Sequence, residues 1–216
     1  MASNTSIETA QIILKASFIG PTELLSIQSV FPLSVSRINK TAPAIPWSSA
    51  QLETVRDTHV LILGCPETQN NDALTLNFLR AYYGVNPDLR EPCFYNQDWY
   101  LHEEFASTFQ LSTMWYLLRK DVLKESRAAQ PQEFTEKHSL SLPSALLTAY
   151  TFFAYYFLNH KSLLWEHDFV WCNDVDHNRD QIYTGRYHDP DRVNKNGFNI
   201  HRYLSIRENY GIVETL

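Results

Sequence analysis

The sequence lacks the short motifs that identify the commonest nucleotide-binding and hydrolytic sites. It has no Walker loop G-x-x-x-x-G-K-[ST], no G-x-G-x-x-G, no G-x-S-x-G and no C-x-x-C. Its single apolar run of strand length, residues 59–63, also falls short of the several strands that a doubly wound sheet needs. These absences argue against a P-loop NTPase, a Rossmann-type enzyme, an α/β-hydrolase and a cysteine-ligated zinc site.

Runs of basic residues are also absent, and the formal net charge is -6. An acidic chain without a basic patch repels the phosphate backbone, so we expect that nucleic acid is not a partner. Residues 1–11 lack a basic segment followed by an apolar core, so no signal peptide is expected.

Cysteine is scarce, and its count of 3 is odd: Cys65, Cys93 and Cys172. Their spacing fits no disulfide framework or metal motif, so we expect reduced thiols and a cytoplasmic location. Cys93 precedes an expected helix. It is either a nucleophile activated by the helix N-terminus or a small buried residue.

The composition is that of one globular domain over residues 1–216, with 44% hydrophobic and 19% charged residues. Aromatic residues reach 13%, which indicates either an aromatic-rich core or a stacking surface. Residues 59–63 read as a buried strand. Helices are expected over about 6–17, from 21, from 48, over about 74–82, over about 96–109 and, from an ambiguous apolar run, over 113–124.

The segment 142–158 is apolar on nearly every side. A membrane span needs about 20 such residues, and this run is shorter and contains Thr148, Tyr150 and Thr151. We therefore expect a buried central helix over about 144–158 and no membrane association.

The last quarter of the chain predicts β-structure. Residues 169–172 and 182–187 flank a polar turn, as in a hairpin, and residues 198–206 alternate apolar and polar side chains. Arg202 interrupts the apolar face and needs a partner if it is buried. The predicted fold is α+β: a mostly helical N-terminal two-thirds, then a mainly antiparallel C-terminal sheet packed on helix 144–158.

The polar turn holds alternating oxygen side chains at Asp174, Asp176, Asn178 and Asp180. Hard cations are caged by such groups, so the loop is a candidate site for calcium or magnesium. Arg179 stands where an EF-hand loop requires glycine, and Gly185 where it requires glutamate. The alternative is a polar hairpin turn, in which Asp and Asn are favoured and an arginine such as Arg179 neutralises the carboxylates.

Asp98 and His102 form the candidate catalytic pair. On the expected helix 96–109 they are four residues apart and share one face, where a carboxylate raises the basicity of an imidazole. The alternative is an exposed surface pair of small energetic effect. The dipeptide His102-Glu103 begins H-E-x-x-H, but Ala106 stands where the second histidine is required.

A cluster rich in tyrosine, histidine, aspartate and arginine lies near the C-terminus. Its members are candidates for binding a polar or anionic ligand, with arginine as the bidentate donor. They are Tyr183, Arg186, His188, Asp189, His201 and Arg202. The alternative is a solvated sheet face with ordinary ion pairs.

Two functions follow from these patterns. The first is a ligand-binding or protein-interaction module that uses the C-terminal face to hold a small polar or anionic ligand or a protein partner. The second is a hydrolase of a polar substrate, with Asp98 and His102 or the loop 174–180 in its site. An enzyme requires segments 95–104 and 174–202 to converge, whereas a module requires only an accessible patch.

Overall fold

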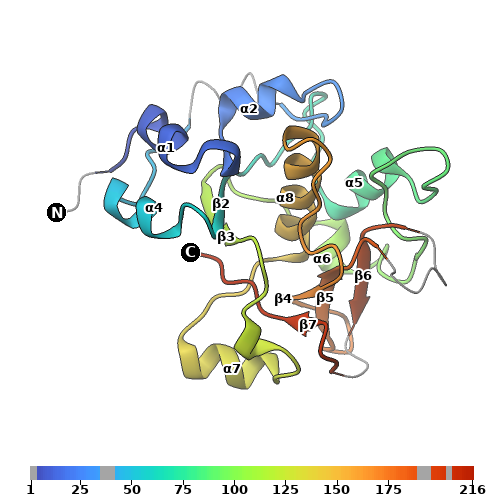
Figure 1. Ribbon diagram of the computed structural model, residues 1–216. Helices are drawn as coiled ribbons and strands as arrows, with labels where there is room; N and C mark the ends of the chain where they lie inside the picture. Colours follow the sequence, from blue (N-terminus) through green and yellow to red (C-terminus); the bar gives the residue numbers. More distant parts are fainter. Residues whose placement is uncertain (1–3, 35–41, 189–195, 203–205) are drawn as a thin grey trace.

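Two small β-sheets pack against one central helix, as Figure 1 shows for the computed structural model. The structure describes residues 4–34, 42–188, 196–202 and 206–216. Helix α8 (Ala145–Leu158) contacts both sheets. The Tyr150 hydroxyl donates a hydrogen bond to the Leu63 carbonyl in the first sheet (3.0 Å), and Thr148 Oγ1 lies 2.8 Å from Thr184 Oγ1 in the second.

The first sheet contains β1 (Phe18–Ile19), β2 (His59–Leu63) and β3 (Trp115–Arg119) in that order. Strand β2 pairs with β1 in parallel and with β3 in antiparallel orientation. All five residues of β2 are buried, as its continuous apolar pattern predicts for a central strand. The backbone of Leu216 bonds that of Leu117 in both directions, so the end of the chain extends this sheet beside β3.

The second sheet has the order β6-β5-β4-β7. The antiparallel hairpin of β4 (Phe169–Val175) and β5 (Gln181–Gly185) confirms the predicted pair of strands around a polar turn. Strand β6 (Asn199–Arg202) adds antiparallel to β5, whereas β7 (Tyr210–Gly211) runs parallel to β4. Of the predicted strand 198–206, residues 199–202 form β6, and residues 203–205 lie outside the described residues.

The remaining helices are short. Ser48 and Gln51 have the sequence spacing of a capping box, which predicts the helix from residue 48. The structure confirms it, because the Ser48 side chain accepts from the Gln51 amide and the Gln51 side chain accepts from the Ser48 amide. A 3-10 turn follows the first helix at Lys15–Ser17, and another lies at Lys124–Ser126. The helices are α1 (Ile7–Leu14), α2 (Pro21–Ser26), α4 (Ser49–Val55), α5 (Leu76–Tyr83), α6 (Glu104–Ser107) and α7 (Pro131–His138).

The central position of α8 confirms the prediction from its apolarity. Eleven of its 14 residues are buried. Ser144 caps it by accepting a hydrogen bond from the Leu147 amide (3.0 Å). Within the described ranges, no helix combines the length and apolarity that a bilayer crossing requires.

The predicted fold class is wrong in two respects. The N-terminal two-thirds is not mostly helical, because in residues 4–34 and 42–144 the helices span eight residues or fewer and share the chain with the β1-β2-β3 sheet. The C-terminal sheet is mixed rather than mainly antiparallel, because β7 pairs in parallel with β4. Residues 113–124 contain β3 instead of a helix. Pairing with the fully buried β2 decides that segment, and no local periodicity reports such a pairing.

All three cysteines are free and buried. Burial raises the pKa of the Cys65 and Cys93 thiols to about 11, and that of Cys172 is raised as well. A thiolate nucleophile needs the opposite shift, so these values favour the interpretation of Cys93 as a small buried residue.

Candidate functional site

The segment that carries Asp98 and His102 is a series of turns. The Leu101 amide donates to the Asp98 carbonyl (3.1 Å) and the Glu103 amide donates to the Tyr100 carbonyl (3.0 Å), and helix α6 begins only at residue 104. The predicted helix over 96–109 is therefore wrong in its first half. Asp98 and His102 are both exposed, and the helical face that was expected to join them is absent from this segment. Their catalytic role stays a prediction.

The segment around Trp99 nevertheless packs against the C-terminal sheet. Gln97 Nε2 donates to His201 Nε2 (2.8 Å), and Trp99 Nε1 donates to the Ile200 carbonyl (3.2 Å). The Arg202 guanidinium lies over the Trp99 ring at 5.3 Å, a cation–π contact. Segments 95–104 and 174–202, each selected from its polar residues alone, therefore meet in space.

Asp176 organises the turn between β4 and β5. Its Oδ1 accepts hydrogen bonds from the backbone amides of Asn178 (2.9 Å) and Asp180 (2.8 Å), and its Oδ2 accepts from Arg202 Nη1 (3.2 Å). The Asp176 side chain is fully buried. Arg202 thus supplies the positive charge that the sequence pattern assigned to Arg179. Its side chain is 38% exposed, and Asp176 is its partner.

Asp174 serves a different element. Its Oδ2 accepts a hydrogen bond from the Ala145 amide (2.5 Å) at the start of α8. Burial raises the pKa of Asp174 to about 6, against that hydrogen bond. Asn178 is exposed on the turn. Of the four predicted ligands of a hard cation, Asp174 and Asp176 therefore bind separate parts of the fold, and the calcium or magnesium site at Asp174, Asp176, Asn178 and Asp180 stays a prediction.

The raised pKa of Asp174 predicts a pH-dependent stability. The folded protein holds this proton more tightly than the unfolded chain, so ionisation between about pH 4 and pH 6 lowers the free energy of unfolding. Asp174→Asn keeps the acceptor and removes the charge. We expect it to stabilise the protein by about 2–3 kcal/mol above pH 6 and to have no effect below about pH 4.

Urea unfolding of both proteins from pH 3.5 to 8 measures this difference. Asp98→Asn is the matched control, because Asp98 is exposed. A difference between Asp174→Asn and wild type that is the same at every pH contradicts the expectation.

Glu103 and His177 form the closest ionisable pair of this region. His177 Nδ1 lies 2.6 Å from Glu103 Oε1, and the His177 backbone amide donates to Glu103 Oε2 (3.0 Å). The Glu103 side chain is 10% exposed and the His177 side chain 67% exposed. Glu103, Asp176 and His177 each place one potential metal-ligating atom within 4.8 Å of the others.

The sequence patterns did not select Glu103 or His177. The two residues are 74 positions apart, and only the packing of α6 against the β4–β5 turn brings them together. The one available signal was their position. Glu103 lies directly after His102, and His177 lies between Asp176 and Asn178, so each lies inside a segment that was selected for other residues.

The predicted ligand-binding residues of the C-terminal sheet are partly buried. Tyr183 is 2% exposed, and its ring stacks on that of His201 with centroids 5.7 Å apart. The Tyr210 hydroxyl donates to that of Tyr183 (3.4 Å). Burial lowers the pKa of His201. These contacts place Tyr183 and His201 in the packing of the sheet.

Three other members of that predicted cluster, Arg186, His188 and Asp189, follow β5 in the chain. The Arg186 guanidinium stands 5.8 Å from the Phe169 ring centroid. The His188 amide donates to the Glu166 carbonyl (3.0 Å). Asp189 lies outside the described residues. Binding of an anionic ligand by this cluster stays a prediction.

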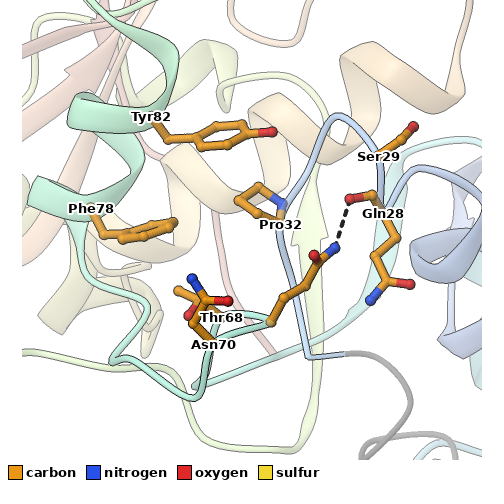
Figure 2. A pocket seen from close by; sticks show the side chains of 8 residues that line it. Gln28, Ser29, Pro32, Thr68, Asn70, Phe78 and Tyr82 are labelled. Carbon is orange, nitrogen blue, oxygen red and sulfur yellow. Dashed lines mark hydrogen bonds between the residues drawn. The ribbon is translucent and has the colours of Figure 1, made fainter.

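A groove of about 610 Å³ lies elsewhere, among the loop after α2, the loop after β2 and helix α5. In Figure 2, Phe78 and Tyr82 project from α5 on the same side as Pro32, with Thr68 and Asn70 below them. All of its lining residues are uncharged. They are Gln28, Ser29, Pro32, Thr68, Gln69, Asn70, Phe78 and Tyr82.

The aromatic wall of the groove is ordered by its neighbours. Phe78 and Tyr82 are one helical turn apart, and their ring planes differ by 13° with centroids 6.2 Å apart. The Arg90 guanidinium lies 4.5 Å from the Tyr82 ring centroid. Both aromatic side chains remain half-buried, so each keeps accessible surface on the groove side.

The polar wall presents hydrogen-bond acceptors. Gln28 Nε2 donates to the Leu33 carbonyl and Gln69 Nε2 donates to the Gln28 carbonyl, each at 3.0 Å. Each amide nitrogen thus uses one of its two N–H donors. Within the described part of the chain, the side-chain Oε1 atoms of Gln28 and Gln69 have no hydrogen-bond partner, so they are available to a ligand that donates.

The sequence patterns did not select this groove. Phe78 and Tyr82 read as core positions of an amphipathic helix, which is the usual meaning of that spacing. Gln69 and Asn70 read as loop residues, and Gln28 lies within the helix that is expected from residue 21, although α2 ends at Ser26. Only the docking of two separate loops beside α5 shows that the two sets face one hollow.

Comparisons with known proteins found no matching protein family, no matching curated protein and no matching solved structure.

Proposed function

We propose that the protein is a binding module for a small uncharged polar ligand, held in the groove between α5 and the two loops. The observation that supports this most is the lining. It combines two accessible aromatic rings with amide and hydroxyl side chains and no charged group, in a volume that suits a small molecule.

The lining also defines the chemistry of the ligand. A charged ligand would leave its solvation shell without meeting an opposite charge, which is costly. The acceptors Gln28 Oε1 and Gln69 Oε1 favour a ligand with hydroxyl or N–H donors. The rings of Phe78 and Tyr82 favour a ligand that also has an apolar face.

The groove supports binding better than the predicted C-terminal face does. Tyr183 on that face is 2% exposed, and His201 is bonded to Gln97. Opening this face to a ligand would break contacts of the sheet, whereas the groove is open. Of the expected partners, a small polar ligand is therefore favoured over an anionic one.

A hydrolase is the second candidate function, and one observation favours it. The buried carboxylate of Glu103 holds His177 through Nδ1, and the exposed imidazole keeps Nε2 for proton exchange. This arrangement replaces the predicted pair of Asp98 and His102 as the acid–base candidate. Neither Glu103 nor His177 lines the groove, so binding in the groove is proposed without catalysis.

The cytoplasmic location remains part of the proposal. Three free, buried cysteines support a reducing compartment, because oxidising compartments favour disulfide formation.

Titration followed by two-dimensional amide NMR tests the binding function. The probes are a neutral sugar such as N-acetylglucosamine, its anionic counterpart glucuronate and its cationic counterpart glucosamine, together with uridine and uridine monophosphate. We expect neutral probes to shift amides of residues 28–32, 68–70 and 78–82. Tyr82→Ala should weaken that binding roughly tenfold, through the loss of one aromatic contact.

Phe109→Ala is the matched control, because Phe109 is an exposed aromatic residue that does not line the groove. Its affinity for the neutral probes should equal that of wild type. Tighter binding of the anionic probes would refute an uncharged ligand. Shifts centred on residues 183–202 would place the site on the C-terminal face, and either result refutes the proposal.

A further inference from the structure

We propose that Glu103, Asp176 and His177 form a site for a borderline divalent metal ion such as Zn²⁺. One carboxylate oxygen from each acid and one ring nitrogen of the histidine lie within 4.8 Å of one another. The residues come from two segments, the start of α6 and the β4–β5 turn, which Figure 1 shows beside each other. The inference is independent of the groove.

The donor set selects the kind of metal. An imidazole with two carboxylates is a ligand set that zinc and similar transition metals accept, with water completing the coordination. Calcium takes six to eight oxygen ligands, and Asp174 is bound to the Ala145 amide at the start of α8, away from this site. The structure therefore favours a different ion, held by a different ligand set, from the hard cation that the loop pattern predicts.

The ligand atoms keep capacity for a metal. Each carboxylate has about four lone-pair positions, of which Glu103 uses two, both for His177. The 2.6 Å contact between Glu103 Oε1 and His177 Nδ1 is a hydrogen bond, so a metal ion that both groups hold replaces the proton between them. The imidazole is 67% exposed, which gives a metal ion a path from solvent.

Arg202 is the competing cation. It bonds Asp176 Oδ2 at 3.2 Å, and Asp176 Oδ1 is used by two backbone amides of the turn. A metal ion must therefore share or take Oδ2 from Arg202. The Arg202 side chain is 38% exposed and stacks on Trp99, so it can release the carboxylate without being buried unpaired. Because Arg202 and the metal ion compete for Asp176 Oδ2, the metal affinity is modest and depends on Arg202.

This competition predicts in which direction each substitution changes the Zn²⁺ affinity. Isothermal titration of the whole protein with ZnCl₂ should show one site, with CaCl₂ giving no heat. His177→Ala should weaken Zn²⁺ binding at least tenfold, as the loss of a ligand does. Arg202→Gln should strengthen it roughly two- to fivefold, by removal of an ion pair.

Two controls separate this site from other ways of binding zinc. Asn178→Ala changes the same turn without removing a proposed ligand and should bind Zn²⁺ as wild type does. His167→Ala removes one of two histidines whose rings lie 6.0 Å apart elsewhere and should have no effect. Zinc binding that survives His177→Ala, or that is lost in His167→Ala, overturns the proposal, as does unchanged or weaker binding in Arg202→Gln. His177 is largely exposed, so circular dichroism should show a folded His177→Ala protein.

Discussion

Phe153→Ala is expected to lower the free energy of unfolding by about 3–5 kcal/mol, the largest effect that we predict. Phe153 is fully buried on α8. Its ring packs against Tyr83 with centroids 4.1 Å apart, against Phe94 at 5.0 Å and against Phe198 at 6.1 Å. These rings come from three separate segments, so truncation leaves a cavity where several parts of the fold meet.

Denaturant unfolding monitored by circular dichroism measures this loss. Phe157→Ala is a matched control one turn further along the same helix. Phe157 is half-buried and its ring lies 5.9 Å from Tyr83, so we expect a smaller loss. Equal losses in the two variants would show that position 153 is not the centre of the core.

Asp176→Ala is expected to lower the free energy of unfolding by about 2–4 kcal/mol. The substitution removes a fully buried carboxylate that accepts three hydrogen bonds, two from the turn and one from Arg202. Burial by itself raises the pKa of Asp176, but the hydrogen bonds from Asp180, Arg202 and Asn178 outweigh it and lower the pKa. The fold therefore stabilises the ionised carboxylate.

Asp176→Asn separates the contribution of the hydrogen bonds in the turn from that of the ion pair with Arg202. The amide oxygen can still accept from the turn, but the charge that pairs with Arg202 is lost, so an intermediate destabilisation is expected. Asp98→Ala, at an exposed carboxylate, should change the stability by less than about 0.5 kcal/mol. Thermal and urea unfolding provide the values. A destabilisation by Asp176→Ala as small as that of Asp98→Ala would mean that the turn and the ion pair do not depend on this carboxylate.

The candidate sites differ in how far local pattern could predict them. Asp176 was selected because oxygen side chains alternate along a turn, and the structure places it at the centre of that turn. Its partner Arg202 was selected as a charge in need of a partner and as a candidate ligand-binding residue, and neither pattern identified the partner as Asp176. No spacing pattern predicted the pairing of Glu103 with His177, because a contact across 74 residues leaves no trace in the spacing of either segment.

The groove illustrates the same limit for binding surfaces. Helical spacing places Phe78 and Tyr82 on one face of α5, and that part of the prediction is local. Whether such a face is covered depends on what packs there. Here the loops around Gln28 and Gln69 stop short of covering the rings and leave a hollow.

Features that depend on neighbours along the chain could be predicted from the amino-acid sequence. The capping box at Ser48, the buried strand His59–Leu63, the β4–β5 hairpin and the buried helix α8 all follow from short-range spacing and apolarity. Each of them is stabilised by groups a few residues apart or by a continuous apolar surface, so a single sequence suffices to predict it.

Features that depend on distant partners could not be predicted in this way and are visible in the three-dimensional arrangement alone. Strand β3 forms because β2 offers it a buried edge, and the two-residue strand β7 is too short to carry any period. The parallel pairing of β7 with β4, the contact of Glu103 with His177 and the groove beside α5 all join segments far apart in the chain. The free energy of such contacts is realised only when both partners are in place, and so no local pattern encodes them.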